Sequence, residues 1–567
     1  MRRKKNLQIG ISDFRHLIEE NGYFVDKTLL IKELIDSGFH VLLMPRPRRF
    51  GKSLNLSMLK CYFDYREKDT QALFEPFQIW QTDEFYKKQQ GRRPVIHFSL
   101  KRGKATNFEA SKKAIYSVIT DIYNDFIWLL ETDTLSKNEV ADFNKIIFRA
   151  ADSVLYEAAI KQLSEYLHRQ SGEKVLILLD EYDAAIHAGF YHGFYDEIIA
   201  LMKSILGNTF KDNRSLYKGV ITGILRISKE SIFSDMNNHG IFTVLSTSFS
   251  DKFGFTEKEV KALLEYFNYG EEYPDVKAWY NGYKFGNTEE IYNPWSICNY
   301  IALHADGFKS YWGNTSSDDI IRSSITTREN TEIRADIEAL IKGESITKIL
   351  NANITFSDLR QDPDIFWSLL TFSGYLTPVQ DFDFDTYELR IPNYEIHTLF
   401  RKIILTWFSR DLKVYQNTLR KMTTALAAGR FIEFEAAFKK IMGDTFSYFD
   451  IHTEPERVFQ AYVLGLLGML SDDYIIKSNR ELGKGRYDIL LIPKDRTRYG
   501  ILMELKQIDK DATDDKVQAS LASALQQIQD NQYYKELKAQ AISEHLEIAI
   551  VFVGKEAYLR HQFRKIN

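Results

Sequence analysis

The segment 46–53, with the sequence RPRRFGKS, constrains the fold of this chain more than any other. It follows a short apolar run, residues 41–44, and it precedes residues 54–59, whose apolar spacing is helical. A strand, a tight loop that ends in Gly-Lys-Ser, and a helix form the physical arrangement of a phosphate-binding loop. The helix N-terminus offers unpaired backbone N–H groups and the positive end of a dipole to phosphate. We therefore expect a nucleoside triphosphate at Gly51, with Lys52 on its terminal phosphates and the Ser53 hydroxyl on magnesium.

The loop departs from the usual pattern, which begins with a glycine five residues before Gly51. Arg46 stands at that position, and arginine resists the positive φ that glycine accepts easily. Pro47 also removes one backbone donor. Guanidinium groups bind phosphate well, so Arg46, Arg48 and Arg49 can compensate for these losses. An ordinary basic loop ahead of a helix is the alternative interpretation of this segment taken alone.

A second segment, residues 174–183, is a continuous apolar run that ends in acids. Such a run is typical of a parallel strand that is covered on both faces. Because ligands of open α/β sheets bind at the carboxyl ends of strands, we expect Asp180 to hold magnesium and Glu181 to polarise the attacking water. The alternative is an acidic loop that caps the next helix.

A third segment, residues 217–226, has the pattern of another strand of the same sheet. Thr222 at its end is placed to sense the γ-phosphate, and Arg226 to stabilise the charge of that phosphate. Both residues have a plain alternative, since Thr222 is also a normal strand residue and Arg226 a normal surface one.

These segments resemble an AAA-ATPase-like family of bacterial proteins that carry a nuclease-like C-terminal domain. The resemblance rests on residues 23–28 (YFVDKT), the loop at 46–53, residues 179–183 (LDEYD) and the pair Thr222–Gly223. In that family the RPRRFGKS form of the loop is usual, so the loop departs from the general pattern and not from the family. The resemblance implies that the chain binds ATP, and by itself it leaves hydrolysis open.

Length and composition bound the class of protein. A chain of 567 residues is too long for one core and suggests about three domains. Its net charge of −4 lacks the basic excess of a protein that coats nucleic acid. Two cysteines form no disulfide framework, and the basic start is followed by no apolar signal core. We expect a cytoplasmic protein with no membrane partner, and we leave open whether it forms a homo-oligomer.

The order of the patterns divides the chain into three parts. Residues 1–235 alternate strands and helices, as in a parallel α/β ATPase domain. Residues 236–384 place aromatic residues beside turn residues, and they begin with a capping-box sequence at 256–259. We interpret this part as a helical lid packed on the ATPase sheet, with a base-stacking platform as the alternative. Residues 385–567 have a helical lead-in and then return to α/β.

The last part contains a second set of chemically active residues. Residues 485–492 and 499–506 are strand patterns joined by a polar turn. If they pair as a hairpin centred near residue 496, Asp488 lies opposite Glu504 with Cβ atoms about 5 Å apart. Lys506 shares the face of Glu504 because side chains alternate along a strand. Two carboxylates and a lysine can bind magnesium and orient water, and Gln526 on the following helix can reach the same place.

This arrangement resembles the PD-(D/E)XK nuclease superfamily, whose core is matched by Asp488, Glu504 and Lys506. The resemblance also implies a helix near Glu456, where an acidic residue helps to bind metal. Phe459-Gln460 departs from the Tyr-His that is common in that helix. An exposed hairpin with routine charges is the alternative interpretation, and such folds can also keep their acids and lose turnover.

The sequence thus predicts an α/β multidomain protein, with a P-loop ATPase parallel sheet, a helical lid and a C-terminal PD-(D/E)XK nuclease-like domain. Three functions stay open. The first is an ATPase coupled to magnesium-dependent cleavage of DNA or RNA. The second is an ATP-controlled switch or binding protein with a non-cleaving nuclease fold. The third is a plain ATPase whose C-terminal part is structural. Intact acids at both places favour the first.

Overall fold

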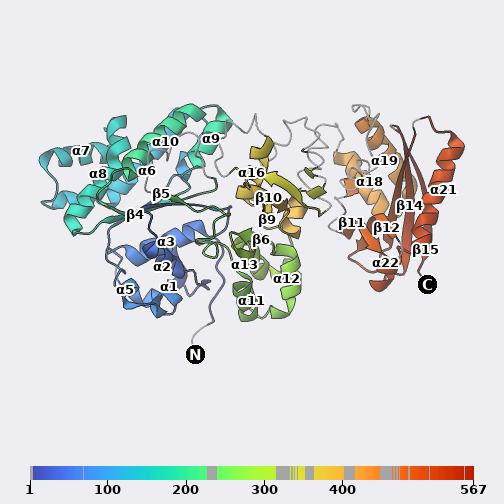
Figure 1. Cartoon of the computed structure of the whole chain (residues 1–567), viewed down its shortest axis with the longest axis horizontal. Coiled ribbons are helices and arrows are strands. Elements are labelled where there is room, and N and C mark those ends of the chain that lie inside the picture. Colours follow the sequence, from blue (N-terminus) through green and yellow to red (C-terminus); the bar gives the residue numbers. More distant parts are fainter. Residues whose placement is uncertain are drawn as a thin grey trace. The chain divides into compact units, whose positions relative to one another are not determined.

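The computed structural model describes residues 4–225 except 68, residues 239–313, 343–351, 363–382, 384–400, 416–446, 473–482, 485–509, 511–554 and 556–566, and isolated positions in 333–340 and 463–470. The chain divides into two compact units (Figure 1). One consists of Met1–Ser316 with Ser345–Ile396, and the other of Ser317–Glu344 with His397–Asn567. The division into three parts at residues 235 and 384 stays a prediction.

The first unit is built on a five-stranded sheet in which every pairing is parallel, in the order β2-β3-β4-β1-β5. The predicted apolar runs form its central strands, which are buried on both faces. The strands are β1 (Val41–Pro45), β2 (Val95–Ser99), β3 (Val175–Asp180), β4 (Leu216–Gly223) and β5 (His239–Ile241). Because β4 lies between β1 and β3, the ends of these three strands meet at one edge of the sheet.

Helices cover both faces of this sheet (Figure 1). Helices α1, α2 and α3 pack on one face, where their side chains share a hydrophobic core with Leu42, Leu176 and Val220. The helices up to β5 are α1 (Phe14–Glu19), α2 (Leu29–Asp36), α3 (Lys52–Phe63), α4 (Gln71–Phe74), α5 (Glu84–Lys87), α6 (Phe108–Asp125), α7 (Lys137–Ile147), α8 (Ser153–Ser171), α9 (Ala184–His192) and α10 (Tyr195–Phe210). The parallel α/β architecture predicted from the sequence is confirmed.

The aromatic-rich region that follows, which we call the lid, packs within the first unit. Its helices are α11 (Glu257–Tyr266), α12 (Tyr273–Tyr280), α13 (Pro294–Ala302) and α16 (Pro363–Ser373). Thr256 caps α11, and Glu259 bonds back to it in the predicted capping box. Side chains of the three helices α11–α13 share one core, in which aliphatic residues of α11 pack with aromatic residues of α12 and α13, as expected for packing. The sequence did not reveal the short strands β6 (Tyr283–Phe285), β7 (Thr288–Ile291), β8 (Ile346–Ile349), β9 (Thr377–Asp381) and β10 (Thr386–Arg390), because segments this short carry little alternation.

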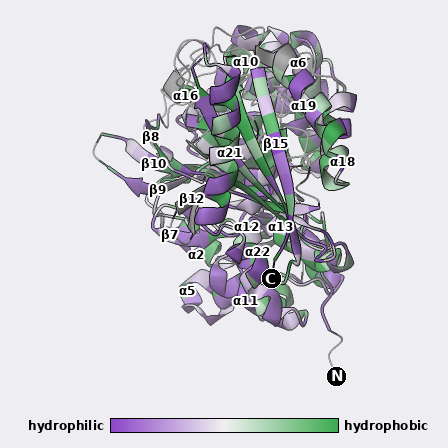
Figure 2. Ribbon diagram, turned by 90° about the vertical axis from the view of Figure 1, so that its right-hand side faces the viewer, coloured by the Kyte–Doolittle hydropathy of each residue, from purple (hydrophilic) through white to green (hydrophobic). Residues whose placement is uncertain are grey.

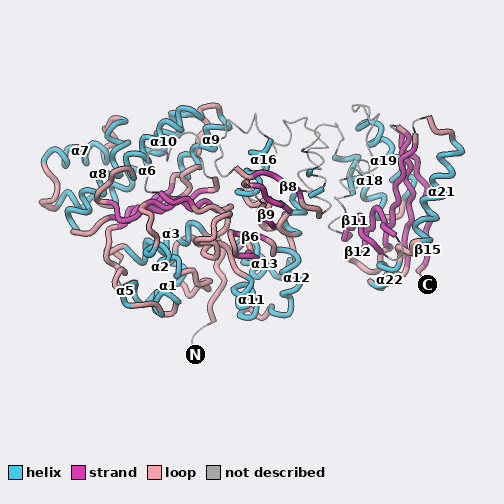
Figure 3. The backbone as a smooth tube through the Cα atoms, in the orientation of Figure 1, coloured by secondary structure: helices cyan, strands magenta, loops and turns pink. Residues whose placement is uncertain are grey.

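The second unit contains a mixed five-stranded sheet, in which β13 and β14 are the parallel pair. Helices α18 (Gln416–Ala427) and α19 (Phe431–Phe446) cover one face, and α21 (Asp514–Asp530) covers the other (Figure 3). Figure 2 shows hydrophobic residues on the inner strands and polar ones along the outside of α21. The strands are β11 (Tyr474–Leu482), β12 (Gly485–Pro493), β13 (Gly500–Ile508), β14 (Glu544–Val553) and β15 (Glu556–Lys565), and a short helix, α22 (Lys535–Ala539), precedes β14.

Among the described residues, no helix combines the length and the apolar character that crossing a membrane requires.

Candidate functional site

The polar residues predicted at the strand ends of the first unit come together in one hydrogen-bonded cluster. Strand β1 leads into the loop, and Gly51, with a φ of 84°, is the N-cap of α3. The Ser53 hydroxyl donates to Asp180 Oδ2 at 2.5 Å, and the Thr222 hydroxyl donates to Asp180 Oδ1 at 2.6 Å. The strand order explains this contact, because β4 places Thr222 between the loop and the end of β3. The sequence had suggested these residues separately, and the fold brings them together.

Lys52 is folded back onto the loop that precedes it. Its ammonium group donates to the carbonyls of Arg46 and Pro47, both at 2.9 Å, and the side chain is only 8% exposed. Burial lowers the pKa of Lys52 to about 8, while the nearby carboxylates of Asp180, Asp183 and Glu181 favour its charge. The lysine thus lies beside the helix N-terminus, as expected, and its donors are held by carbonyls of the same loop.

Glu181 follows the end of β3 in a backbone conformation that non-glycine residues rarely adopt, with a φ of 50°. Its N–H donates to Asp180 Oδ1 at 2.9 Å, which helps to hold that conformation. Burial, with a contribution from Asp180, raises the pKa of Glu181. A raised pKa is one of the properties that a general base requires.

Asp183, two residues after Glu181, accepts hydrogen bonds from the backbone beyond β4. It is 2% exposed, and its Oδ2 accepts from the backbone N–H groups of Ile224 and Leu225 at 2.8 and 3.0 Å. His187 approaches the same oxygen at 3.2 Å. These donors lower the pKa of Asp183. Asp183 therefore connects the end of β4 to the start of α9. Glu181, by contrast, is only partly buried.

The arginines of the loop lie in different surroundings. Arg46 is fully buried, and its guanidinium donates to the carbonyls of Pro45, Phe242 and Phe249. This placement does not support the prediction that the Arg46 guanidinium binds phosphate in place of the missing glycine. Arg46 takes part in the loop through its backbone carbonyl, which accepts from Lys52. Its φ is also not positive; Arg49 and Gly51 carry the positive φ values, 67° and 84°.

Arg48 is half-buried, and the guanidinium of the exposed Arg49 lies over the ring of Trp295 at 4.1 Å. Arg226 lies outside the described residues, so its suggested contact with the γ-phosphate stays a prediction.

The second candidate site lies on the hairpin β12–β13. The strand pairs Ile489–Met503, Leu490–Leu502 and Leu491–Ile501 have the predicted register, and its continuation places Asp488 opposite Glu504. The ladder between β12 and β13 ends at Ile489–Met503, whereas β12 also pairs with β11 and β13 with β14 beyond this point. Asp488 Oδ2 accepts from the Leu505 N–H at 2.7 Å, so the carboxylate takes the place of a strand partner. Glu504 is 1% exposed.

Lys506 connects these acids to helix α21. Its ammonium group lies 3.4 Å from Glu504 Oε1 and donates to Gln527 Oε1 at 2.7 Å. The prediction that Gln526 reaches this place is wrong: Gln526 is exposed and donates to Asp530 on the outer side of the helix. One residue along a helix turns the side chain by about 100°, and only the register of α21 against β13 decides between the two glutamines.

Tyr533 is a further neighbour that the sequence analysis missed. It is fully buried, its hydroxyl accepts from Asn531 at 2.8 Å, and burial raises its pKa near Glu504 and Asp488. Tyr533 follows α21, which ends at Asp530, and no pattern in the sequence marks it as a neighbour of the hairpin acids. Glu456, the suggested additional metal ligand, lies outside the described residues.

Comparison with known proteins assigns a family to each of the two regions that contain the candidate sites. Residues 8–233 match the family model described as "Predicted AAA-ATPase", and residues 454–562 match that of the PD-(D/E)XK nuclease superfamily. The chain carries an AAA-ATPase-like domain and a nuclease-superfamily domain. A protein of Azotobacter chroococcum mcd 1, "Uncharacterized protein in vnfD 5'region", is 28% identical over 424 residues, which is 73% of each chain. The resemblance and the fold class predicted from the sequence are confirmed.

The AAA-ATPase-like domain has ligands of the type that magnesium requires. A serine hydroxyl and a carboxylate within hydrogen-bonding distance are hard oxygen donors, and Mg²⁺ prefers such oxygens together with water and phosphate. Ser53 and Asp180 therefore fit a magnesium ion that arrives with a nucleotide. In the nuclease-superfamily domain, Asp488 and Glu504 supply the same kind of oxygen.

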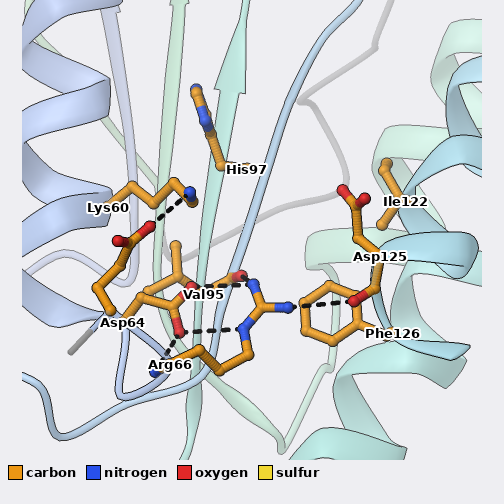
Figure 4. A pocket seen from close by; sticks show the side chains of 9 residues that line it. Lys60, Asp64, Arg66, Val95, His97, Ile122, Asp125 and Phe126 are labelled. Atoms are coloured by element: carbon orange, nitrogen blue, oxygen red, sulfur yellow. Dashed lines mark hydrogen bonds and ion pairs between the residues drawn. The ribbon is translucent and has the colours of Figure 1, made fainter. Parts of the chain in front are cut away.

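A separate polar pocket of about 310 Å³ lies between α3, β2 and α6 (Figure 4). Its two cations already have carboxylate partners in the pocket: Lys60 binds Glu67 at 2.8 Å, and Arg66 binds Asp64 at 2.9 Å. The Arg66 guanidinium also lies over the Phe126 ring at 4.0 Å. These pairings leave the pocket without the excess positive charge that phosphate requires, so it does not compete with the loop as a nucleotide site.

Proposed function

We propose that the AAA-ATPase-like domain binds and hydrolyses ATP, and that the nuclease-superfamily domain uses magnesium to cleave DNA or RNA under the control of that ATP site. The observation that supports the first part best is the cluster of Ser53, Asp180 and Thr222 beside the N-terminus of α3. The loop backbone and the helix end would hold the phosphates. Lys52 would supply a positive charge by exchanging its two loop carbonyls for phosphate oxygens.

Hydrolysis requires a water molecule and a group that orients it. Ser53 and Asp180 would hold Mg²⁺, which neutralises charge on the phosphates when it is bound. Glu181 would orient the water and accept its proton, for which a raised pKa is suited. Thr222 would hold Asp180 in place and contact the γ-phosphate.

The proposal for the nuclease-superfamily domain rests on the contact between Asp488 and the hairpin and on the position of Lys506. Asp488 and Glu504 would hold Mg²⁺, which lowers the pKa of bound water and stabilises charge on a phosphodiester. Lys506 would position that water or the phosphate, and Gln527 would fix the direction of the lysine through its 2.7 Å hydrogen bond.

A second candidate function is an ATP-controlled switch or binding protein with a non-cleaving nuclease fold. One observation favours it: within the part of the chain that the structure describes, no three His, Cys, Asp or Glu side chains are grouped as metal ligands. In addition, Glu504 is almost fully buried. A third ligand such as Glu456 would then decide between a cleaving and a binding domain.

One experiment separates these functions. Purified protein is incubated with Mg-ATP and a panel of single- and double-stranded DNA and RNA, and both phosphate release and strand cleavage are measured. If the wild-type protein cleaves nucleic acid and the Asp488→Ala variant does not, the result supports the nuclease function. Nucleic-acid binding with no cleavage in any nucleotide state supports the switch, and ATP turnover without binding leaves a plain ATPase.

A further inference from the structure

The phosphate loop is held from outside by residues of the lid, which lie far away in the sequence. The backbone carbonyl of Arg48, in the middle of the loop, accepts from the Trp312 indole N–H at 3.2 Å and from the Asn293 side-chain amide at 3.5 Å. Both donors belong to the same compact unit as the loop. A carbonyl fixed by two side chains cannot turn freely, so these contacts restrict the conformation of the loop.

Packing of the loop against the lid adds to these hydrogen bonds. The ring of Phe50 is buried against Tyr283 and Phe285, with ring centroids 5.1 and 5.3 Å apart. Gly374 lies so close to Pro47 that a Cβ atom there would meet the proline ring at 2.8 Å. The loop therefore rests on a surface formed by the lid.

Glu395 links Trp312 to the N-terminus of α13, where Asn293 lies. Its Oε1 accepts from the Trp312 backbone N–H at 2.8 Å, and its Oε2 accepts from the Ser296 hydroxyl at 2.6 Å. Ser296 is in the first turn of α13, where Asn293 is the N-cap. The carboxyl group is 1% exposed, so both hydrogen bonds are shielded from water. Glu395 thereby fixes Asn293 and Trp312 relative to one another.

The sequence of the loop explains why such support is needed. Arg46 replaces the first glycine, Pro47 lacks an N–H, and Arg49 has a φ of 67°. A non-glycine residue in a left-handed conformation persists only where the surrounding structure over-determines it. Here the surrounding structure is the lid.

We propose that Asn293, Trp312 and Glu395 form a clamp on the Arg48 carbonyl that sets the phosphate loop in its binding conformation, with Glu395 as a positioning residue for nucleotide. The clamp deepens the proposed ATP-binding function and rests on it for its effect on affinity. Its effect on the loop itself does not depend on nucleotide.

The test uses Trp312→Phe in the full chain. Phenylalanine keeps a ring against Tyr375, whose centroid lies 4.8 Å away, and keeps the backbone N–H to Glu395, but it removes the donor to Arg48. The matched control is Tyr280→Phe, which removes a buried hydroxyl that donates to the Lys309 carbonyl at 3.0 Å in the same lid. Mg-ATP affinity is measured by calorimetry, and amide hydrogen exchange of residues 47–51 is measured without nucleotide.

We expect Trp312→Phe to weaken Mg-ATP binding about five- to tenfold, as the loss of one shielded hydrogen bond implies, and to speed exchange in the loop. Tyr280→Phe should lower the melting temperature and leave both readouts at wild-type values. Glu395→Ala should behave like Trp312→Phe, while Glu395→Gln, whose amide oxygen still accepts from the Trp312 N–H, should stay near wild type.

Two results would overturn the clamp: wild-type affinity and exchange in both Trp312→Phe and Glu395→Ala, or an equal effect of Tyr280→Phe on both readouts. Should the wild-type chain bind no Mg-ATP, the proposed function fails, and the exchange measurement still decides whether the clamp holds the loop.

Discussion

The two candidate sites hold their carboxylates in different ways. In the AAA-ATPase-like domain, Asp180 accepts from three donors on three segments: the Ser53 hydroxyl, the Thr222 hydroxyl and the Glu181 N–H. In the nuclease-superfamily domain, Asp488 accepts from the N–H of Leu505 on the neighbouring strand. The hydrogen bond from Ser53 to Asp180 joins residues 127 positions apart, whereas the one from Leu505 to Asp488 joins residues 17 positions apart.

Because of this difference, the two sites are sensitive to different substitutions. A carboxylate with several donors keeps its orientation when a single neighbour is changed. A pair of acids on one hairpin depends on the register of two strands and on the helix that covers them. A single substitution in the AAA-ATPase-like site should therefore slow the reaction while the other side chains keep their positions. In the hairpin site, replacing either acid should abolish the function.

The largest effect is expected at the hairpin. Asp488→Ala and Glu504→Ala should each reduce magnesium-dependent cleavage about 1,000-fold or more, because both acids would hold one metal ion that stabilises the transition state. ATP turnover should survive, since its site lies in the other unit. Cleavage of a labelled duplex or single strand measures the effect.

Asp495→Ala is the matched control, because Asp495 is an exposed acid in the turn of the same hairpin. It should cleave like wild type. Full cleavage by Asp488→Ala would show that the hairpin acids do not form a metal site and would remove the contrast between the two domains.

The next effect concerns the acid that would activate water. Glu181→Gln should keep Mg-ATP affinity and slow hydrolysis about 100- to 1,000-fold, the usual contribution of a positioned base. Phosphate release under saturating ATP measures the rate, and calorimetry measures the affinity. Asp183→Asn provides the contrast: it should lower the melting temperature first, because it weakens the bonds to Ile224 and Leu225. If Glu181→Gln hydrolyses at the wild-type rate, water activation must be assigned elsewhere.

The sequence predicted the parts of both sites that depend on local patterns. Apolar runs gave β1, β3 and β4, and Gly51 marked the start of α3. The hairpin register followed from the turn length and the alternation of residues 485–506, and it places Asp488 and Glu504 as expected. Such features need only neighbouring residues to be understood.

The remaining parts depend on contacts that no local pattern encodes. The inward direction of Arg46 depends on the carbonyls of Phe242 and Phe249, about 200 positions away. The roles of Asn293 and Trp312 appear only when the lid rests on the loop. Gln527 rather than Gln526 meets Lys506 because of how α21 packs on the sheet. The tertiary fold decides each of these.

A smaller effect is expected when the positive charge of Lys52 is removed from the phosphate loop. Lys52→Ala should weaken Mg-ATP binding about 10- to 100-fold, the value of a lost charge-assisted hydrogen bond. Lys60→Ala is the matched control, since Lys60 lies near the other end of α3 and pairs with Glu67. It should bind Mg-ATP like wild type. An unchanged dissociation constant for Lys52→Ala in calorimetry would contradict the phosphate-loop assignment.

The smallest effect is expected for two adjacent residues of α21, of which only one contacts the hairpin site. Gln527→Ala removes the acceptor that lies 2.7 Å from the Lys506 ammonium group, and Gln526→Ala removes a side chain that is exposed on the outer side. The first should slow cleavage about five- to tenfold, because the lysine loses its direction, and the second less than about twofold. Both substitutions make the same change in size and helix propensity, so a difference between them reports position alone. Equal rates for the two variants would mean that the contact between α21 and Lys506 does not direct the lysine, and the hairpin would then act without support from the helix.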